Sequence, residues 1–555
     1  MAEPEPSKFA HFESVKHNSV YSLYGRHAEV ARDIHQDALR RFTGNDELTV
    51  DLVRESPIVP ASEGTLDSLE RYDVVSVSSG VGLGAILHGD GIAGNDLVKA
   101  YREKFEEHDM PIYVVSAGNE GKTRETAIPR VADFARNSLV VGEANNSGAQ
   151  PFVEEHSSRN NPTLTSDSPF NRGDKYQYYD VSPSLEGHED LIEDWVIQNE
   201  INAEFDLFKE QNKDQEVDDY MIGVAYTAIS SAKYQQYTET DEGKAWVKEQ
   251  VDGYLENPET LHSQIMAEFR EDYDIDGNGY VTGIDGTSFS APEQAGYISG
   301  AIYEQEQREE KNLPVLMKDE INTLAKMATL DTSAREGMDD PMHSYTNDDG
   351  QQFVVGGGHG VFNPDMFRAL LDEAYTKIGT QPDIDRTSVT TTMSVDIPEG
   401  HNANNSVTLK SNLPGGQDMV IDRIRLDTQF TVDGRVPHFA VLDIPGKDEP
   451  MFTGLQESNS SREFLGWSRM EYKFGETLPG GQDWKVRLDN GGDGILQEAE
   501  VTVYGYNQGG LMDQMMDYSK ELALKMAPQP VSPIEPSAPE PERDGNELPI
   551  PGGPR

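Results

Sequence analysis

Gly286-Thr287-Ser288-Phe289-Ser290-Ala291-Pro292 is the most informative stretch of this chain for predicting its fold and its function. A Gly-Thr-Ser turn leads into a run of small residues that includes Gly296 and Gly300, which indicates a helix beginning at the serine. Proline suits the first turn of that helix, because no N–H partner is lost there. A serine hydroxyl at a helix N-terminus lies where free N–H groups stabilise developing negative charge. The stretch therefore predicts either a plain capped helix or a nucleophile at Ser288.

Two other segments, in a fixed order, favour the nucleophile. Pro111–Gly121 reads PIYVVSAGNEG, an apolar strand running into a tight turn, and Asp73–Gly80 reads DVVSVSSG. Together with the serine segment they resemble the subtilisin family of serine peptidases. The segments Ser138–Asn145 and Gly356–Pro364 resemble that family's next core strand and its closing segment.

The resemblance implies roles for particular residues. Ser288 would be the nucleophile, and the amide of Asn119 would donate to the oxyanion of the tetrahedral intermediate. The substrate would pair as an added strand with Ser78, Ser79 and Gly80, where Ser79 replaces the family's usual leucine. The substrate class implied is a polypeptide.

The general base is expected at the start of a helix upstream of these strands. The comparable stretch, Tyr24–Ile34, reads YGRHAEVARDI, and His27 is the candidate. If Gly25 is matched to the family's glycine, the catalytic position falls on Tyr24, but a tyrosine with a pKa near 10 is no base at neutral pH. The other candidate histidines are His11, His17 and His35, whereas His88 comes too late in the chain and is interpreted as a loop residue.

The orienting acid is not evident. No aspartate precedes His27, and Glu13 is the carboxylate there besides Glu3 and Glu5. The acid is therefore Glu13, comes from elsewhere in the fold, or is missing. Three functions stay open: a serine endopeptidase, weakened if the acid is missing; a catalytically degenerate subtilisin fold that binds peptides or partners; and a structural protein acting through its C-terminal half.

The segment Asp274–Asp285 precedes the nucleophile and has the spacing of a calcium-binding loop. The spacing predicts a structural Ca²⁺, with plain Asx/Gly turns as the alternative. The expected ligands are Asp274, Asp276, Asn278, the carbonyl of Tyr280, and Asp285.

Composition limits the function classes. The 555 residues include 99 acidic and 46 basic side chains, a net charge of −53, and no cysteine. Such a charge argues against nucleic-acid binding and against docking on anionic membranes. No apolar run approaches the ~20 residues needed to span a bilayer, and no secretory signal is recognisable. We therefore expect no membrane insertion, and a cytoplasmic location or export by a leaderless route.

The expected fold class is α/β, a subtilisin-like parallel-sheet catalytic domain followed by an all-β sandwich and a disordered tail. The catalytic domain would comprise residues 1–150 and 273–380, interrupted by a mainly helical insertion at 151–272. That insertion could gate substrate, cover the site or dock a regulatory partner, with plain decoration as the alternative. Residues 388–507 carry period-two strands, and the run around Trp484–Asp489 resembles the end of the P domain of kexin- and furin-type proteases. Residues 508–555 would form a short helix and a proline-rich tail.

Overall fold

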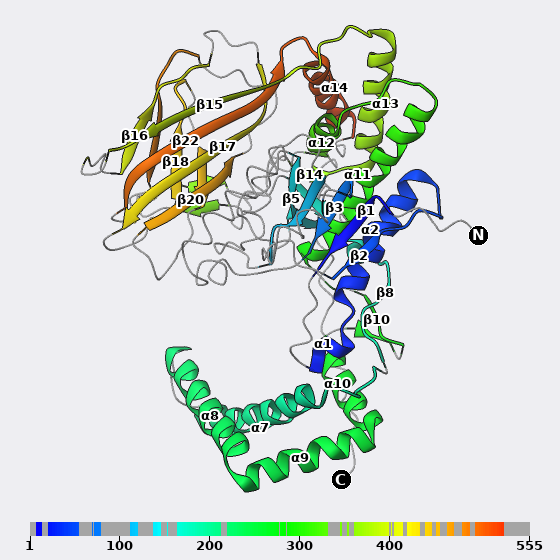
Figure 1. The fold of residues 1–555 in the computed structure, drawn as a ribbon, viewed down its shortest axis with the longest axis vertical. Helices are drawn as coiled ribbons and strands as arrows, with labels where there is room; N and C mark the ends of the chain where they lie inside the picture. Colours follow the sequence, from blue (N-terminus) through cyan, green and yellow to red (C-terminus); the bar gives the residue numbers. More distant parts are fainter. Residues whose placement is uncertain are drawn as a thin grey trace, which may run out of the picture.

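The structure is a computed structural model of the 555-residue chain (Figure 1). It describes residues 7–13, 20–54, 69, 71–78, 111–119, 137–145, 152–153, 164–181, 183–212, 219–272, 274–276, 278–282, 284, 286–330, 344–346, 352–354, 360–398, 401, 405–413, 419–432, 439–446, 451–454, 463–470, 480–488 and 494–526.

A nine-stranded sheet forms the centre of the α/β unit, in the order β11-β14-β7-β5-β4-β3-β1-β2, with β6 paired to β5. The strands from β2 to β14 in that order pair in parallel, and β11 and β6 pair antiparallel. Apolar side chains of the central strands are buried, as expected for a parallel sheet covered by helices. The predicted α/β parallel-sheet fold is confirmed. The strands are β1 (Phe9–Phe12), β2 (Asp51–Val53), β3 (Val74–Val77), β4 (Ile112–Ser116), β5 (Ser138–Asn145), β6 (Phe152–Val153), β7 (Leu164–Asp167), β11 (Thr329–Leu330) and β14 (Val361–Phe362).

Two helices of this unit, α2 (His27–Thr43) and α11 (Thr287–Glu310), pack directly on each other. Their contact depends on glycine: a Cβ on Gly296 would lie 2.4 Å from Cβ of Ala38, and one on Gly300 2.4 Å from the Phe42 ring. The buried stripe of α2 contains the apolar positions expected from the sequence. The close approach of the two helices brings the segments containing Ser288 and His27 together.

The other helices and small strands of the α/β unit complete its core. A 3-10 turn, η1 (Pro169–Arg172), follows β7, and Asn363 caps α13 through the N–H of Met366. The remaining elements are α1 (Val20–Tyr24), β8 (Tyr176–Gln177), β9 (Asp274–Ile275), β10 (Tyr280–Thr282), α12 (Lys318–Met327), the hairpin of β12 (Ser344–Thr346) and β13 (Gln352–Val354), and α13 (Pro364–Thr380).

The helical insertion begins later than the sequence suggested. The sequence predicts it at 151–272, but β7 lies within that range and pairs with β5 and β14 in the central sheet. The predicted start is wrong because β7 is a short, polar-rich strand, LTSD, without clear periodicity. The inserted helices extend as an arm away from the sheet in Figure 1. They are α7 (Glu189–Asn212), α8 (Asp219–Glu239), α9 (Asp241–Glu256) and α10 (Pro258–Asp272).

The C-terminal β domain is a sandwich of two four-stranded antiparallel sheets. Side chains from both sheets, including Met393, Trp484 and Val503, share one core. The first sheet has the order β15-β22-β17-β20 and the second β16-β21-β18-β19. Their strands are β15 (Ser388–Asp396), β16 (Ser406–Leu409), β17 (Met419–Val432), β18 (Phe439–Asp443), β19 (Met451–Gly454), β20 (Glu463–Met470), β21 (Trp484–Leu488) and β22 (Gly494–Asn507). The resemblance of this domain to a P domain stays a prediction.

The chain returns to the α/β unit after the sandwich. Helix α14 (Leu511–Met526) packs against α12 and α13, and its Leu511, Met515 and Met516 belong to the core of that unit. The sequence groups this helix with the tail, because an apolar stripe does not indicate its partner; residues 527–555 lie outside the described residues. In the part of the chain that the structure describes, no helix has the length and apolar character to cross a membrane.

Candidate active site

The site lies at the carboxyl ends of three adjacent strands, where α/β sheets usually bind ligands. Glu13 directly follows β1, Ser78 directly follows β3, and Asn119 lies shortly beyond β4. The pairings Phe12↔Val77 and Val77↔Val115 put these strand ends side by side. The N-termini of α2 and α11 bring His27 and Ser288 to the same place.

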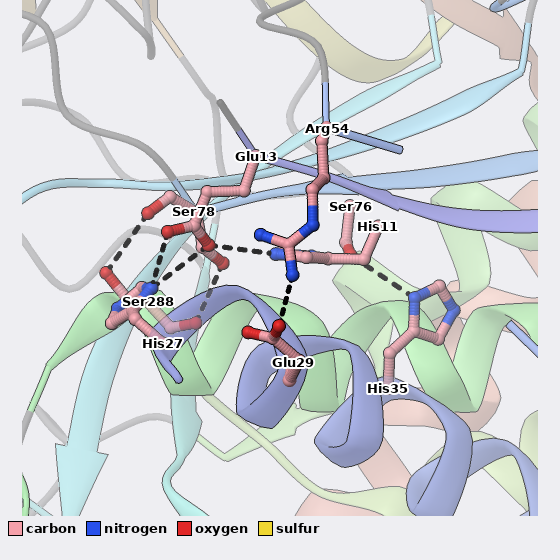
Figure 2. A network of polar contacts seen from close by, with 9 residues as sticks. All are labelled: His11, Glu13, His27, Glu29, His35, Arg54, Ser76, Ser78 and Ser288. Atoms are coloured by element: carbon pink, nitrogen blue, oxygen red, sulfur yellow. Dashed lines mark hydrogen bonds and ion pairs between the residues drawn. The ribbon is translucent and has the colours of Figure 1, made fainter. Parts of the chain in front are cut away.

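Ser288 is half-buried on the first turn of α11 (Figure 2). Its hydroxyl donates to the carbonyl of Ser78 at 3.3 Å, and the Ser78 hydroxyl donates to the Ser288 carbonyl at 2.8 Å. These two bonds fix the start of α11 against the end of β3. Ser78 therefore holds the start of the helix that contains Ser288. Ser79 and Gly80, the other expected substrate-binding residues, lie outside the described residues.

Asn119 is oriented by Thr287, the residue before Ser288. Its side-chain oxygen accepts from the backbone N–H and from the hydroxyl of Thr287, both at 2.9 Å. Since a backbone N–H can only donate, the amide oxygen faces Thr287 and the NH₂ group faces elsewhere. Asn119 is exposed, so this NH₂ group can donate to a bound carbonyl oxygen.

A buried carboxylate that the sequence did not single out also supports this turn. Glu143 on β5 is buried, and its Oε2 accepts from the N–H of Gly286 at 2.5 Å. A Cβ on Gly286 would lie 3.3 Å from Nδ2 of Asn119, so a side chain here would crowd the amide. The sequence contains one signal for the importance of Glu143, which is an acidic residue within a mostly apolar predicted core strand.

Glu13 and His27 form a close pair. The Nδ1 atom of His27 lies 2.8 Å from Oε1 and 3.0 Å from Oε2 of Glu13. Because the carboxylate only accepts, it fixes the proton on Nδ1 and leaves Nε2 as the basic nitrogen. The His27 ring packs 5.1 Å from the ring of Phe289, the residue after Ser288. Glu13, one of the acids that the sequence left open, thus lies against the imidazole of His27.

The charges in this pair are set by competing effects. Burial alone would raise the pKa of Glu13, but the His27 charge and hydrogen bonds from His11 and His27 lower it to about 2. Burial would lower the pKa of His27, and the Glu13 carboxylate overcomes this and raises it above 6.5. Glu13 is therefore ionised at neutral pH, and His27 holds a proton more tightly than an ordinary histidine.

Behind Glu13 runs a chain of buried polar side chains. His11 Nε2 lies 3.2 Å from Glu13 Oε2, and His11 Nδ1 lies 2.8 Å from the Ser76 hydroxyl. The same hydroxyl lies 3.2 Å from His35 Nδ1, and His35 Nε2 lies 2.8 Å from the hydroxyl of Ser299. Thus His11 and His35, which the sequence offered as alternative bases, lie behind the acid (Figure 2).

Tyr24, the alternative that follows from matching Gly25, is placed differently. It is buried and stacks on the ring of His262, 5.9 Å away at 16°. Burial, with a smaller effect from Asp180, raises the pKa of Tyr24 to about 12. Tyr24 is thus no base at neutral pH. His17 and His88 lie outside the described residues.

The expected calcium loop contains a tight hairpin of β9 and β10. The carboxylate of Asp276 accepts from the N–H groups of Asn278 and Tyr280, and the Asp276 N–H donates to the Tyr280 carbonyl. Both Asp276 and Asn278 are exposed, while Asp285 and the side chain of Asp274 lie outside what the structure describes. Within the described residues, no three acidic or histidine side chains gather to hold a metal ion.

Comparison with known proteins gives distant structural likenesses. No family profile matches this chain, and no curated protein matches it. A serine protease of Aeromonas sobria is 11% identical, at a TM-score of 0.42 over 83% of this chain and 77% of that one. A lanthipeptide protease is 11% identical, at 0.31 over 66% and 87%. The patellamide maturation protease PatA is 12% identical, at 0.29 over 66% and 97%. Such low scores leave the geometry of the site as the support for any function.

Proposed function

We propose that this protein is a serine endopeptidase with the triad Ser288, His27 and Glu13. The observation that carries the proposal is the Glu13 carboxylate on His27 Nδ1, beside the first turn of α11, which contains Ser288. A glutamate here can do the work of the usual aspartate, since it fixes the tautomer of the base and stabilises its cation.

The mechanism follows from these atoms. His27 Nε2 takes the proton of the Ser288 hydroxyl as its oxygen attacks the carbonyl carbon of a peptide bond. The Nδ2 group of Asn119 donates to the oxyanion that forms. His27 then gives its proton to the leaving amine, and an acyl-enzyme remains on Ser288. Water, deprotonated by His27, hydrolyses this ester and restores the enzyme.

In the described state, the Ser288 hydroxyl donates to the Ser78 carbonyl. A rotation about its Cα–Cβ bond redirects the hydroxyl. Catalytic hydrogen bonds commonly tighten only when substrate is bound. The contact with Ser78 therefore describes a resting nucleophile.

The test is labelling by a fluorophosphonate, which forms a covalent adduct with an activated serine. We expect the wild-type chain to be labelled and Ser288→Ala to remain unlabelled. Circular dichroism on both samples verifies that each is folded. A folded wild-type protein that does not label, with calcium present, would contradict the proposal and favour the degenerate peptide-binding alternative.

We also propose that the loop from Asp274 to Asp285 binds Ca²⁺. The support is the spacing of oxygen-bearing side chains and the exposure of Asp276 and Asn278 on one turn. Titration with Ca²⁺ should raise the melting temperature of the wild-type chain but not that of Asp276→Ala. An equal response of both proteins would contradict this site.

A further inference from the structure

We infer that His11 is a positioning residue for the triad, at the end of a one-way chain of hydrogen bonds from Ser299 to Glu13. The inference rests on the proposed function, because it concerns the acid of that triad. The direction of these hydrogen bonds fixes one tautomer for His11 and one for His35. It also predicts that substitution of His11 changes the rate of the reaction.

The first step concerns the strands. His11 and Ser76 are register partners on β1 and β3, and Glu13 and Ser78 each lie two residues further along. Because strand side chains alternate between faces, all four belong to one face of the sheet. Helices α2 and α11 cover that face and contribute His27, His35 and Ser299.

The second step fixes the proton of His11. Its Nε2 faces a carboxylate oxygen, which only accepts, so Nε2 carries a hydrogen. His11 is fully buried, and the cost of burying a charge outweighs the attraction of the Glu13 carboxylate and lowers the pKa of His11 below 6.5. His11 is therefore neutral, and its Nδ1 accepts from the Ser76 hydroxyl.

The third step extends this order to α11. Since the Ser76 hydroxyl donates to His11, it accepts from His35, whose Nδ1 therefore carries the hydrogen. The neutral His35 then accepts at Nε2 from the hydroxyl of Ser299. Each donor points toward Glu13: Ser299 to His35, His35 to Ser76, Ser76 to His11, and His11 to the carboxylate. The reverse direction would require a cationic His11.

The consequence for catalysis concerns the carboxylate. The N–H of His11 holds one side of Glu13 while His27 binds the other, so the carboxylate cannot pivot away from the base. The same N–H takes part of the negative charge, which moderates how strongly Glu13 holds the proton of His27. Glu29, on the first turn of α2 and paired with Arg54, is a further charge facing His27.

The first experiment is a set of variants with a pH profile of kcat/KM on a peptide substrate. We expect His11→Phe, which removes the donor, to lower kcat roughly 10- to 100-fold with KM little changed, by analogy with second-layer residues in metal sites. Its acidic midpoint should move to higher pH, because more of the Glu13 charge then faces His27. His11→Gln, whose amide can donate, should recover most of both values.

The control is Ile321→Ala, a buried substitution on α12 remote from the site. It should lower the melting temperature without moving the acidic midpoint. If His11→Phe behaves like this control, or if His11→Gln recovers no more activity than His11→Phe, His11 is only structural and the inference is wrong.

The second experiment is independent of activity and of the variants' folding. In the ¹⁵N spectrum of the wild-type chain at neutral pH, His11 should have a bare Nδ1 and a protonated Nε2, and His35 the opposite arrangement. A doubly protonated His11, or the same tautomer for both rings, would overturn the inference. Failure of fluorophosphonate labelling would instead contradict the proposed function and leave the tautomers as measured.

Discussion

Two buried carboxylates lie near the same pair of helices, and their partners differ in kind. Glu13, 9% exposed, is bound by His27 and His11, which can gain or lose a proton near neutral pH. Glu293, 1% exposed on α11, is bound by Arg172 at 2.8 Å, Arg41 at 3.2 Å and the Tyr297 hydroxyl at 2.9 Å.

On the proposed function, the difference separates the acid of the triad from a structural carboxylate. Arginine stays charged at any ordinary pH, so the cluster around Glu293 is a permanent clamp between α2, η1 and α11. The cluster around Glu13 contains the same charge but neighbours whose protonation changes, and it opens to the half-buried His27. Substitution of Glu13 should therefore mainly lower the activity, and substitution of Glu293 should mainly lower the stability.

The largest expected effect is the loss of activity in Glu13→Gln. The amide cannot stabilise the His27 cation and can hold the wrong tautomer, so kcat should fall about 10⁴-fold, as for the acid of similar triads. Steady-state kinetics on a peptide substrate measures this. A decrease of less than tenfold would mean that Glu13 is not the acid.

The matching change at the other carboxylate, Glu293→Gln, should mainly affect stability. It replaces the buried carboxylate by a neutral amide beside Arg172 and Arg41, whose side chains are 32% and 45% exposed, so the loss should be about 1–3 kcal/mol in the free energy of unfolding. Urea denaturation measures this, and kcat of the folded fraction should stay within a few-fold of wild type. A loss of kcat like that of Glu13→Gln would remove the distinction between the clusters.

A third substitution, Asn119→Ala, touches neither carboxylate and tests the oxyanion donor. Without its NH₂ group, kcat should fall about 10²- to 10³-fold with KM little changed. The acidic midpoint of the rate profile should not move, because the Glu13–His27 pair is intact. A change in KM alone would indicate a role in binding the substrate.

The rate should also depend on pH through His27. Because its pKa is raised above 6.5 by Glu13, the basic form is lost as pH falls through that raised value. The pH profile of kcat/KM should therefore show an acidic midpoint above 6.5. In Glu13→Gln the His27 pKa, followed by NMR, should fall, whereas in Glu293→Gln it should not change.

The smallest effect is the pH dependence of stability. Burial lowers the pKa of His11 and His35 below 6.5 in the folded state. As pH falls, these two histidines therefore bind protons in the unfolded chain before they do so in the folded chain. Stability should fall as pH drops below 6.5, and further between 4.5 and about 2 as Glu13 is protonated. The raised pKa of His27 acts in the opposite direction and offsets part of this loss.

Urea denaturation of wild type and His11→Gln between pH 5 and 8 measures this dependence. The variant should lose less stability on acidification, because it lacks one of the two histidines whose pKa is lowered by burial. Equal slopes would show that burial of His11 does not control its proton.

Much of the site followed from local sequence patterns. The Gly-Thr-Ser helix start and the strand before Asn119 are contiguous in sequence, and they place Ser288 and the amide of Asn119 close together. Glu13 stayed one of several choices, because its distance from His27 depends on how β1 and α2 pack. The sequence does contain a signal for the hydrogen-bonded side chains next to Glu13. Polar residues alternate in two otherwise apolar strands, as His11-x-Glu13 and Ser76-x-Ser78.

The fold was predictable where periodicity was strong. The stripe of α2 and the period-two strands of the sandwich gave these elements, but the short β7 did not show its place in the sheet. The surface against which α14 packs could not be predicted. An amphipathic pattern indicates that a helix packs on the protein, but it does not indicate which surface the helix covers.

Helix α14 has a consequence for how the protein is made. The sandwich is attached to the α/β unit at both ends, by α13 on entry and α14 on return, and Lys326 pairs with Asp422 across their contact. The core of the α/β unit therefore lacks the packing of α14 while the ribosome is still adding residues 381–510. Synthesis of the β domain delays completion of the unit that precedes it.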